Sequence, residues 1–85
     1  MVTRADVEKK LLTYLNRNTT LVELVDWAEQ TMMEGEFEPK DTDLLADIIA
    51  RLGLADVREF GLTWEDCYDF LTRLGYQVRV TAMAT

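Results

Sequence analysis

The 85-residue chain contains no histidine and only one cysteine, Cys67. Without histidine it lacks the side chain that most often serves as a general base or metal ligand near neutral pH. A single cysteine can form neither an internal disulfide nor a Cys/His zinc site. Glu65, Asp66 and Asp69 surround Cys67 in the sequence, and their charges raise a thiol pKa. We therefore expect a buried structural cysteine and not a nucleophile.

Long apolar runs and clustered glycines are also missing. No uninterrupted apolar segment approaches the roughly 20 residues of a membrane span. The first residues lack the apolar core of a signal peptide. The four glycines are isolated, which excludes a glycine-rich phosphate-binding loop. These absences predict a cytoplasmic protein that does not enter a membrane.

Positive charge is scarce, because the chain has nine basic and sixteen acidic side chains, which gives a formal net charge of −7. Nucleic-acid backbones and anionic membranes require clustered Lys and Arg, so both are disfavoured as partners. A basic protein is favoured, although acidity can also serve solubility alone. With no reactive constellation in the sequence, we expect no enzyme activity, no catalytic residue, no metal and no cofactor.

Hydrophobic spacing predicts one compact domain over residues 1–85, mainly α, with four helices and a short C-terminal β-strand. Thr3 can cap the first helix. Thr20 and Glu23 have the spacing of a capping box, which starts the second helix. Apolar residues keep helical spacing from there to about Met33.

The second half of the chain contains one eight-residue sequence pattern twice, at residues 47–54 and 69–76, and we call this pattern the repeated phrase. In each copy an aspartate precedes an arginine by four residues, as Asp47 does Arg51 and Asp69 does Arg73. This spacing favours an ion pair within one helix. A glycine follows in each copy, which predicts a helix end with that glycine in the left-handed conformation.

Proline and threonine mark where the last two helices begin. Either Pro39 or Asp41 starts the third helix, and Thr63 caps the fourth. Phe37, in the loop before the third helix, is expected to reach into the core. The segment 55–60 between the two helices fits either a helical turn or a short extended piece.

Apolar and polar residues alternate over residues 76–81, which predicts a half-buried strand followed by a flexible tail at 82–85. A lone strand leaves backbone groups unpaired. Its partner is either the segment 55–60 or the same strand of a second copy, which would give a two-fold dimer. The candidate self-association residues are Tyr76, Gln77, Val78, Arg79 and Val80.

Acidic side chains gather around the loop before the third helix. Their near-alternate spacing suggests a calcium loop, but the turn glycine and terminal glutamate of that motif are misplaced. A solvated acidic surface for a basic partner is the better interpretation. The candidate partner-binding residues are Trp27, Glu23, Glu34, Glu36, Glu38, Asp41 and Asp43.

The two tryptophans are expected to play different roles. Trp64 lies on the apolar stripe of the fourth helix with Cys67 and Leu71, so we expect it in the core. Trp27 lies off the apolar face of the second helix, on the side of Glu23 and Glu34. It is therefore either a core residue or an aromatic anchor for a partner.

Residues 11–16, the capping Thr20 and residues 21–33 with their acidic continuation give an arrangement that resembles small helical immunity proteins. These are the immunity proteins of the colicin D-like and contact-dependent-inhibition type, and the resemblance covers roughly residues 7–49. Such proteins are acidic helical modules that occlude the basic active site of a toxin nuclease. The segment from residues 52–54 to 74–76, with a Leu-Gly pair at each helix end, also resembles the sequence of sterile-alpha-motif modules. The helices before this segment differ from those of such modules in number and order.

Two functions follow from this sequence. The first is a non-enzymatic acidic protein-binding module, in its most concrete form an inhibitor or immunity-type protein that blocks a basic partner such as a nuclease toxin. The alternative is a self-associating, homodimeric structural or adaptor protein. It would be joined through the predicted strand and through surplus apolar surface on the second helix.

Overall fold

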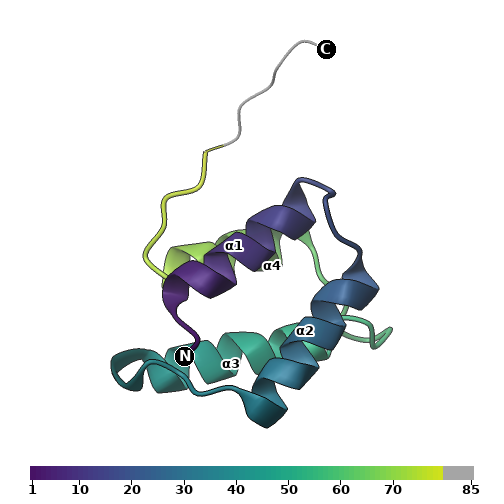
Figure 1. Cartoon of the computed structure of the whole chain (residues 1–85). Helices are drawn as coiled ribbons and strands as arrows, with labels where there is room; N and C mark the ends of the chain where they lie inside the picture. The colour runs from purple at the N-terminus through teal and green to yellow at the C-terminus, as the bar shows by residue number, and fades with distance from the viewer. Residues whose placement is uncertain (80–85) are drawn as a thin grey trace.

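A computed structural model describes residues 1–79 of the chain. Four α-helices and one 3₁₀ turn follow in the order α1 (Arg4–Leu15), α2 (Leu21–Glu34), η1 (Pro39–Asp41), α3 (Thr42–Gly53) and α4 (Trp64–Arg73). α2 packs along α3, while α1 packs on α4 (Figure 1). The predicted mainly α, four-helix architecture is therefore confirmed. None of the helices in the described range is long and apolar enough to cross a membrane.

Threonines begin three of the helices, as the sequence predicts. Reciprocal capping boxes close the N-termini of α1 and α4, through Thr3 with Asp6 and Thr63 with Asp66. At α2 the hydroxyl of Thr20 accepts a hydrogen bond from the backbone N–H of Glu23. The Glu23 carboxylate, however, accepts from the Thr19 hydroxyl at 2.6 Å. The predicted capping box is thus only half formed, because Thr19 takes the carboxylate.

All four helices contribute buried apolar side chains to one core. In α3 and α4 these side chains recur with the i, i+3, i+4, i+7 spacing of a single helix face. The core residues are Val7, Leu11, Leu24, Ala28, Leu45, Ile48, Ile49, Leu52, Cys67, Phe70, Leu71 and Leu74. Phe37 packs against them from the loop, as predicted, and forms an isolated parallel bridge with Val2.

Arg4 ties three parts of the fold together. Its Nη2 donates to Asp41 Oδ1 at 2.9 Å, and its Nη1 donates to the backbone oxygen of Leu74 at 3.0 Å. Pro39 opens η1, and Asp41 stands at the N-cap position of α3, but its side chain makes no capping hydrogen bond. Since Arg4 binds that carboxylate, Asp41 joins helices instead of capping one.

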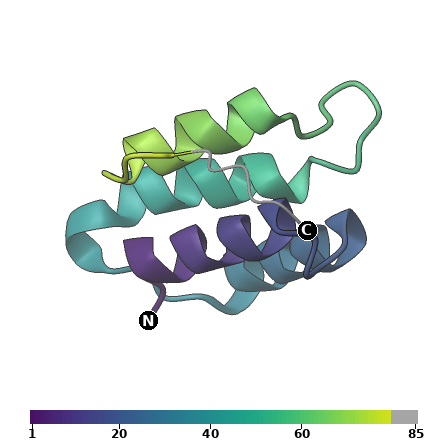
Figure 2. The ribbon, with the colours of Figure 1, turned by 90° about the horizontal axis from the view of Figure 1, so that it is seen from above.

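The predicted C-terminal strand is absent from the described part of the chain. Residues 76–79 are irregular, and residues 80–81 lie outside the described range. The segment 55–60 forms consecutive turns, one of them closed by the Val57 N–H donating to the Leu54 oxygen at 3.0 Å. It therefore offers no extended edge, and alternation of side chains without a partner strand does not make a strand. Seen from above, this connection loops out at one end of the bundle (Figure 2).

The two copies of the repeated phrase end their helices differently. Gly75 has φ = 95°, the left-handed conformation that the sequence predicts. Gly53 is instead the last residue of α3 and does not have a positive φ. The left-handed position falls later, at Gly61 with φ = 63°. The chain leaves α3 through further turns of the same hand, so no reversal is needed at Gly53.

Candidate functional site

The charged residues on the solvent-facing side of α2 are all acidic, and the apolar Val22 and Met33 are exposed among them. The helix has four exposed carboxylates and no Lys or Arg, and its buried residues lie on the opposite face. We call these four residues the acidic ridge: Glu23, Asp26, Glu29 and Glu34. More broadly, residues 18–39 contain six carboxylates and no basic residue. The sequence analysis did not single out Asp26 and Glu29, although this lack of basic residues was a readable signal.

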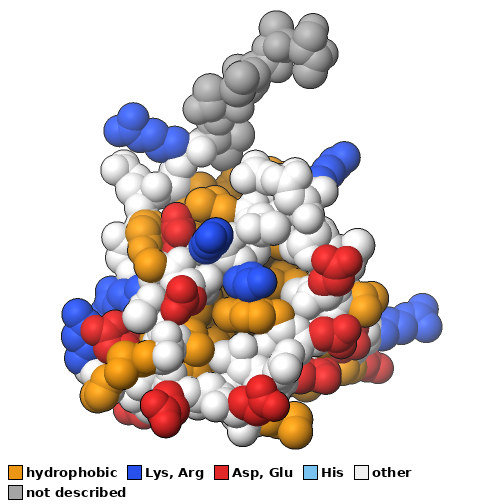
Figure 3. All heavy atoms as spheres, viewed as in Figure 1, with side chains coloured by type: hydrophobic (Ala, Val, Ile, Leu, Met, Phe, Trp, Pro, Cys, Tyr) orange, Lys and Arg blue, Asp and Glu red, His pale blue; other side chains and the backbone are white. Residues whose placement is uncertain are grey.

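The ion pairs of the described residues lie elsewhere. They are Arg4 with Asp41, Lys40 with Glu38, Arg51 with Asp66, and Arg73 with Asp47. No carboxylate of the acidic ridge belongs to one of these pairs within residues 1–79. On the face shown in Figure 3, most acidic side chains lie in the lower half, over α2 and α3. The negative charge of α2 is therefore not neutralised by the fold itself.

Trp27 is half-buried on the flank of α2 that faces α1. The Nζ of Lys10 lies 5.6 Å from the centre of the Trp27 ring, which is a cation–π geometry. Trp27 and Glu34 both line a hollow of about 280 Å³. Of the two carboxylates expected beside this ring, Glu34 shares the hollow with it and Glu23 is not among the lining residues. On the other side of the ring, α1 brings Lys9 and Lys10 into a second hollow of about 330 Å³.

The remaining predicted acidic residues separate in the fold. Glu36 and Asp43 are exposed, and Glu38 lies 3.6 Å from Lys40. Asp41 is 6% exposed, so the prediction that it faces a partner is wrong. Arg4 draws it inward, and the hydrogen bond from Arg4 lowers the pKa of Asp41 against the opposing effect of burial.

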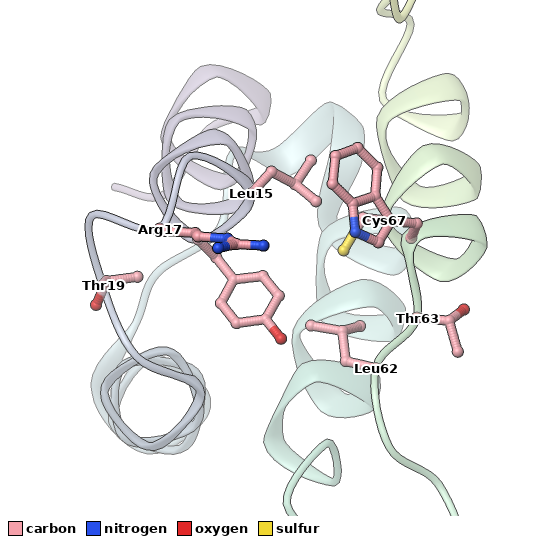
Figure 4. A pocket seen from close by; sticks show the side chains of 8 residues that line it. Leu15, Arg17, Thr19, Leu62, Thr63 and Cys67 are labelled. Carbon is pink, nitrogen blue, oxygen red and sulfur yellow. The ribbon is translucent and has the colours of Figure 1, made fainter. Parts of the chain in front are cut away.

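Trp64 is 57% exposed, which corrects its expected place in the core. It is the first residue of α4, one turn before the buried stripe begins at Cys67, and its ring packs edge-to-face on Tyr68 with 5.6 Å between centroids. It helps to line a pocket of about 190 Å³ between the end of α1 and the start of α4 (Figure 4). The lining residues are Tyr14, Leu15, Arg17, Thr19, Leu62, Thr63, Trp64 and Cys67.

Cys67 forms part of the wall of this pocket and is fully buried. Burial, reinforced by the nearby Asp66 charge, raises the pKa of its thiol to about 11. The thiol is therefore protonated near neutral pH. The expectation of a buried cysteine is confirmed.

An apolar groove lies between α2 and α3, and the sequence analysis anticipated only its α2 side. Met33 is 85% exposed, Met32 44% and Leu54 42%. We call this hollow of about 410 Å³ the α2–α3 groove, and it is lined by Glu29, Met32, Met33, Ile49, Ala50, Gly53 and Leu54. The small residues Ala50 and Gly53 on α3, three positions apart, were the signal for its other side.

The candidate self-association residues lie beyond α4. Tyr76, Gln77 and Arg79 are exposed, Val78 is half-buried against the core, and Val80 is outside the described range. Tyr76, Gln77 and Val78 line a wide, open hollow with Tyr68, Thr72 and Gly75. Tyr76, Gln77 and Val78 therefore lie on one surface, although residues 76–79 do not form a strand.

Among residues 1–79, no three His, Cys, Asp or Glu side chains converge on a point that could hold a metal ion. Comparisons with protein-family models, with curated proteins and with solved structures find no match to this chain.

Proposed function

We propose that the protein is a non-enzymatic binding module that uses the acidic ridge to bind a basic protein. The observation that carries this proposal is the charge asymmetry of residues 18–39, with six carboxylates and no Lys or Arg. No ion pair inside the described fold competes for the ridge. A basic partner gains the attraction of the ridge without breaking an internal ion pair of the described residues, and long-range attraction also speeds its encounter.

The most concrete form of this function is an inhibitor or immunity-type protein that covers a basic active site, such as that of a nuclease toxin. Glu23 and Glu34 are eleven residues apart on α2, which spans about 16 Å at a rise of about 1.5 Å per residue. That length matches roughly five phosphates along one nucleic-acid strand. The ridge carboxylates would then stand in for phosphates in the partner's site.

Trp27 would supply an apolar contact at the edge of the same surface. It shares a hollow with Glu34, and the flexible Lys10 side chain places its Nζ 5.6 Å from the centre of the ring. Lysine side chains rotate easily, so a partner can displace this one and take its place against the indole. Tryptophans in such positions often carry a large share of binding energy.

Affinity capture from the native host tests the proposal when it compares two triple variants. The ridge variant is Glu23→Gln, Glu29→Gln and Glu34→Gln. The matched control removes three exposed charges elsewhere, by Glu59→Gln, Glu65→Gln and Asp69→Asn. We expect the native protein and the control to retain a basic protein at about 0.1 M salt and release it at about 1 M, where the Debye length falls from ~10 Å to ~3 Å. The ridge variant should retain none.

Equal losses in the two variants would contradict the proposal, because net charge and not the position of the ridge would then decide binding. Capture that persists at about 1 M salt in the native protein would also contradict it.

A second candidate function is self-association through residues 76–79. The backbone N–H groups of Gln77, Val78 and Arg79 donate to no group within residues 1–79, and Tyr76 is 36% exposed. The same segment of a second copy could satisfy these donors and give a two-fold homodimer, as in a structural or adaptor protein. Sedimentation at about 50 μM, which detects even a weak interface, would show a dimer. A monomer at that concentration would reject this candidate.

A further inference from the structure

We propose that the α2–α3 groove receives an amphipathic helix with basic flanks, presented by the partner protein. This inference rests on the proposed function, because the acidic ridge borders the groove. It goes further by naming the structural element of the partner and the side chains that seat it.

Large apolar side chains line the sides of the α2–α3 groove, and the α3 residues between them, Ala50 and Gly53, are small. Met33 is 85% exposed, and Met32 and Leu54 are 44% and 42% exposed. Gly53 has no side chain, and a Cβ built on it would meet only Glu29 Cγ, at 3.7 Å. Unbranched methionine side chains adjust to the shape of an apolar partner. The groove can therefore take up apolar side chains without displacing backbone.

The acidic side chains beside the groove favour a bound segment that carries positive charge. Glu29 is part of its lining, and Asp26 lies one turn earlier on the same helix. α2 contributes no basic side chain to this surface. An apolar strip flanked by Lys or Arg is the complement of an apolar floor with acidic borders.

A second copy of this chain fits the groove poorly. In a two-fold contact the same patch lies on both sides of the interface, so each acidic border of the groove would face an equally acidic patch. Glu29, and Asp26 one turn before it, would then lie at an interface with the acidic border of the second copy, and like charges across an interface cost several kcal/mol. The occupant is therefore a basic partner and not another molecule of this protein.

The shape of the groove favours a helix over an extended peptide. Its walls are two packed α-helices, α2 and α3. A third helix can lie between them and insert side chains at i, i+3, i+4 and i+7. The described surface of the groove presents no sheet edge to which an extended chain could add.

Titration with designed peptides tests the proposal directly. The probe is a helical peptide of about 18 residues, or five turns, with leucines at i, i+3, i+4 and i+7 and lysines on both flanks. Methyl-labelled methionine gives the readout, because Met32 and Met33 line the groove while Met1, also exposed, lies elsewhere. We expect the Met32 and Met33 methyl signals to shift, the Met1 signal to stay, and the Kd to be micromolar.

Two control peptides and two variants sharpen this result. A scrambled peptide of the same composition and a peptide with glutamate in place of lysine should each bind at least about tenfold more weakly. Ala50→Gln puts a longer neutral side chain at an exposed helix position in the groove, and should weaken binding of the lysine peptide about fivefold or more. Ala5→Gln, at an exposed position of α1, should leave binding unchanged.

Four outcomes would overturn the proposal. One is the absence of Met32 and Met33 shifts with the lysine peptide, whether or not it binds. Another is equal binding of that peptide and its scrambled form through the acidic ridge. This result would reject the groove as a binding site for a helix, but it would leave the proposed binding of a basic protein by the ridge intact. A third is a change of these methyl signals on dilution of the protein alone, which would make a second copy the occupant. The last is an unaltered affinity in Ala50→Gln.

Discussion

Arg73 of α4 forms its ion pair with Asp47 of α3, and not with Asp69, which precedes it by four residues in its own helix. Arg51 of α3 likewise reaches α4 and lies 3.5 Å from Asp66. The repeated sequence phrase thus joins two helices through its arginines. Helical spacing makes a local pair possible, but each arginine side chain is long enough to reach a carboxylate on the neighbouring helix.

A double-mutant cycle distinguishes the two pairings of Arg73. We expect Asp47→Ala and Arg73→Ala to show a coupling of about 0.2–1 kcal/mol in urea unfolding, typical of a partly exposed pair. The cycle of Asp69→Ala with Arg73→Ala should give a coupling near zero. A larger coupling for Asp69 would mean that the local pair forms in solution.

The charged hydrogen bond from Arg4 to Asp41 makes the free energy of unfolding depend on pH in the acidic range. Because the Arg4 hydrogen bond holds the pKa of Asp41 below its ordinary value of 3.8, the ionised carboxylate stabilises the fold above that pH. The contribution is lost as pH falls through the lower pKa of the folded state. We expect Asp41→Asn to be less stable than the native protein at neutral pH, with the difference shrinking below about pH 4.

Urea unfolding at several pH values measures this difference, and Asp43→Asn is the matched control because Asp43 is exposed at the start of the same helix. A stability difference for Asp41→Asn that stays constant from neutral to acid pH would contradict the role of this carboxylate.

The two glycines of the repeated phrase should respond oppositely to alanine. Gly75 has φ = 95°, and a Cβ there would lie 3.2 Å from Arg4 Nη1, so Gly75→Ala should destabilise the protein by about 1 kcal/mol or more. Gly53 is in the helix, where a Cβ would make one ordinary contact, with Glu29 Cγ at 3.7 Å, so Gly53→Ala should stabilise by about 0.5–1 kcal/mol. Chemical unfolding of the two variants measures both effects, and equal signs would contradict the assigned conformations.

Cys67 should resist thiol reagents in the folded protein. Its side chain is buried and the pKa of its thiol is raised to about 11, so little thiolate is accessible at about pH 8. We expect labelling to be slow in buffer, to quicken as urea populates the open state, and to be immediate in unfolded protein. Fast labelling in buffer would show that α4 does not shield the sulfur.

Local chemistry in the sequence was enough to locate the helices. Thr3 and Thr63 cap where they were expected, because a side-chain hydroxyl and the backbone N–H groups beside it act within one turn. The end of α4 just before Gly75 was also predictable, because the left-handed conformation of a glycine after the last helical turn is a local property of the chain. The buried faces of α3 and α4 were also predictable, since apolar spacing needs no knowledge of the partner helix.

Features that depend on neighbours were not predictable. Trp64 shares the spacing of a buried stripe, yet no helix within residues 1–79 covers its ring, which is 57% exposed. Asp41 looked like a surface acid because its partner, Arg4, is 37 residues away. The candidate site was therefore anticipated in its charge and in the position of Trp27. The α2–α3 groove required the packing of two helices to become visible.

The association rate of the captured basic partner, measured against salt concentration, tests the central claim most directly. The account predicts a steep fall of the rate with rising ionic strength for the native protein and for the control variant of Glu59, Glu65 and Asp69. The ridge variant of Glu23, Glu29 and Glu34 should associate slowly at every salt concentration. A native association rate that does not change with ionic strength would contradict the account.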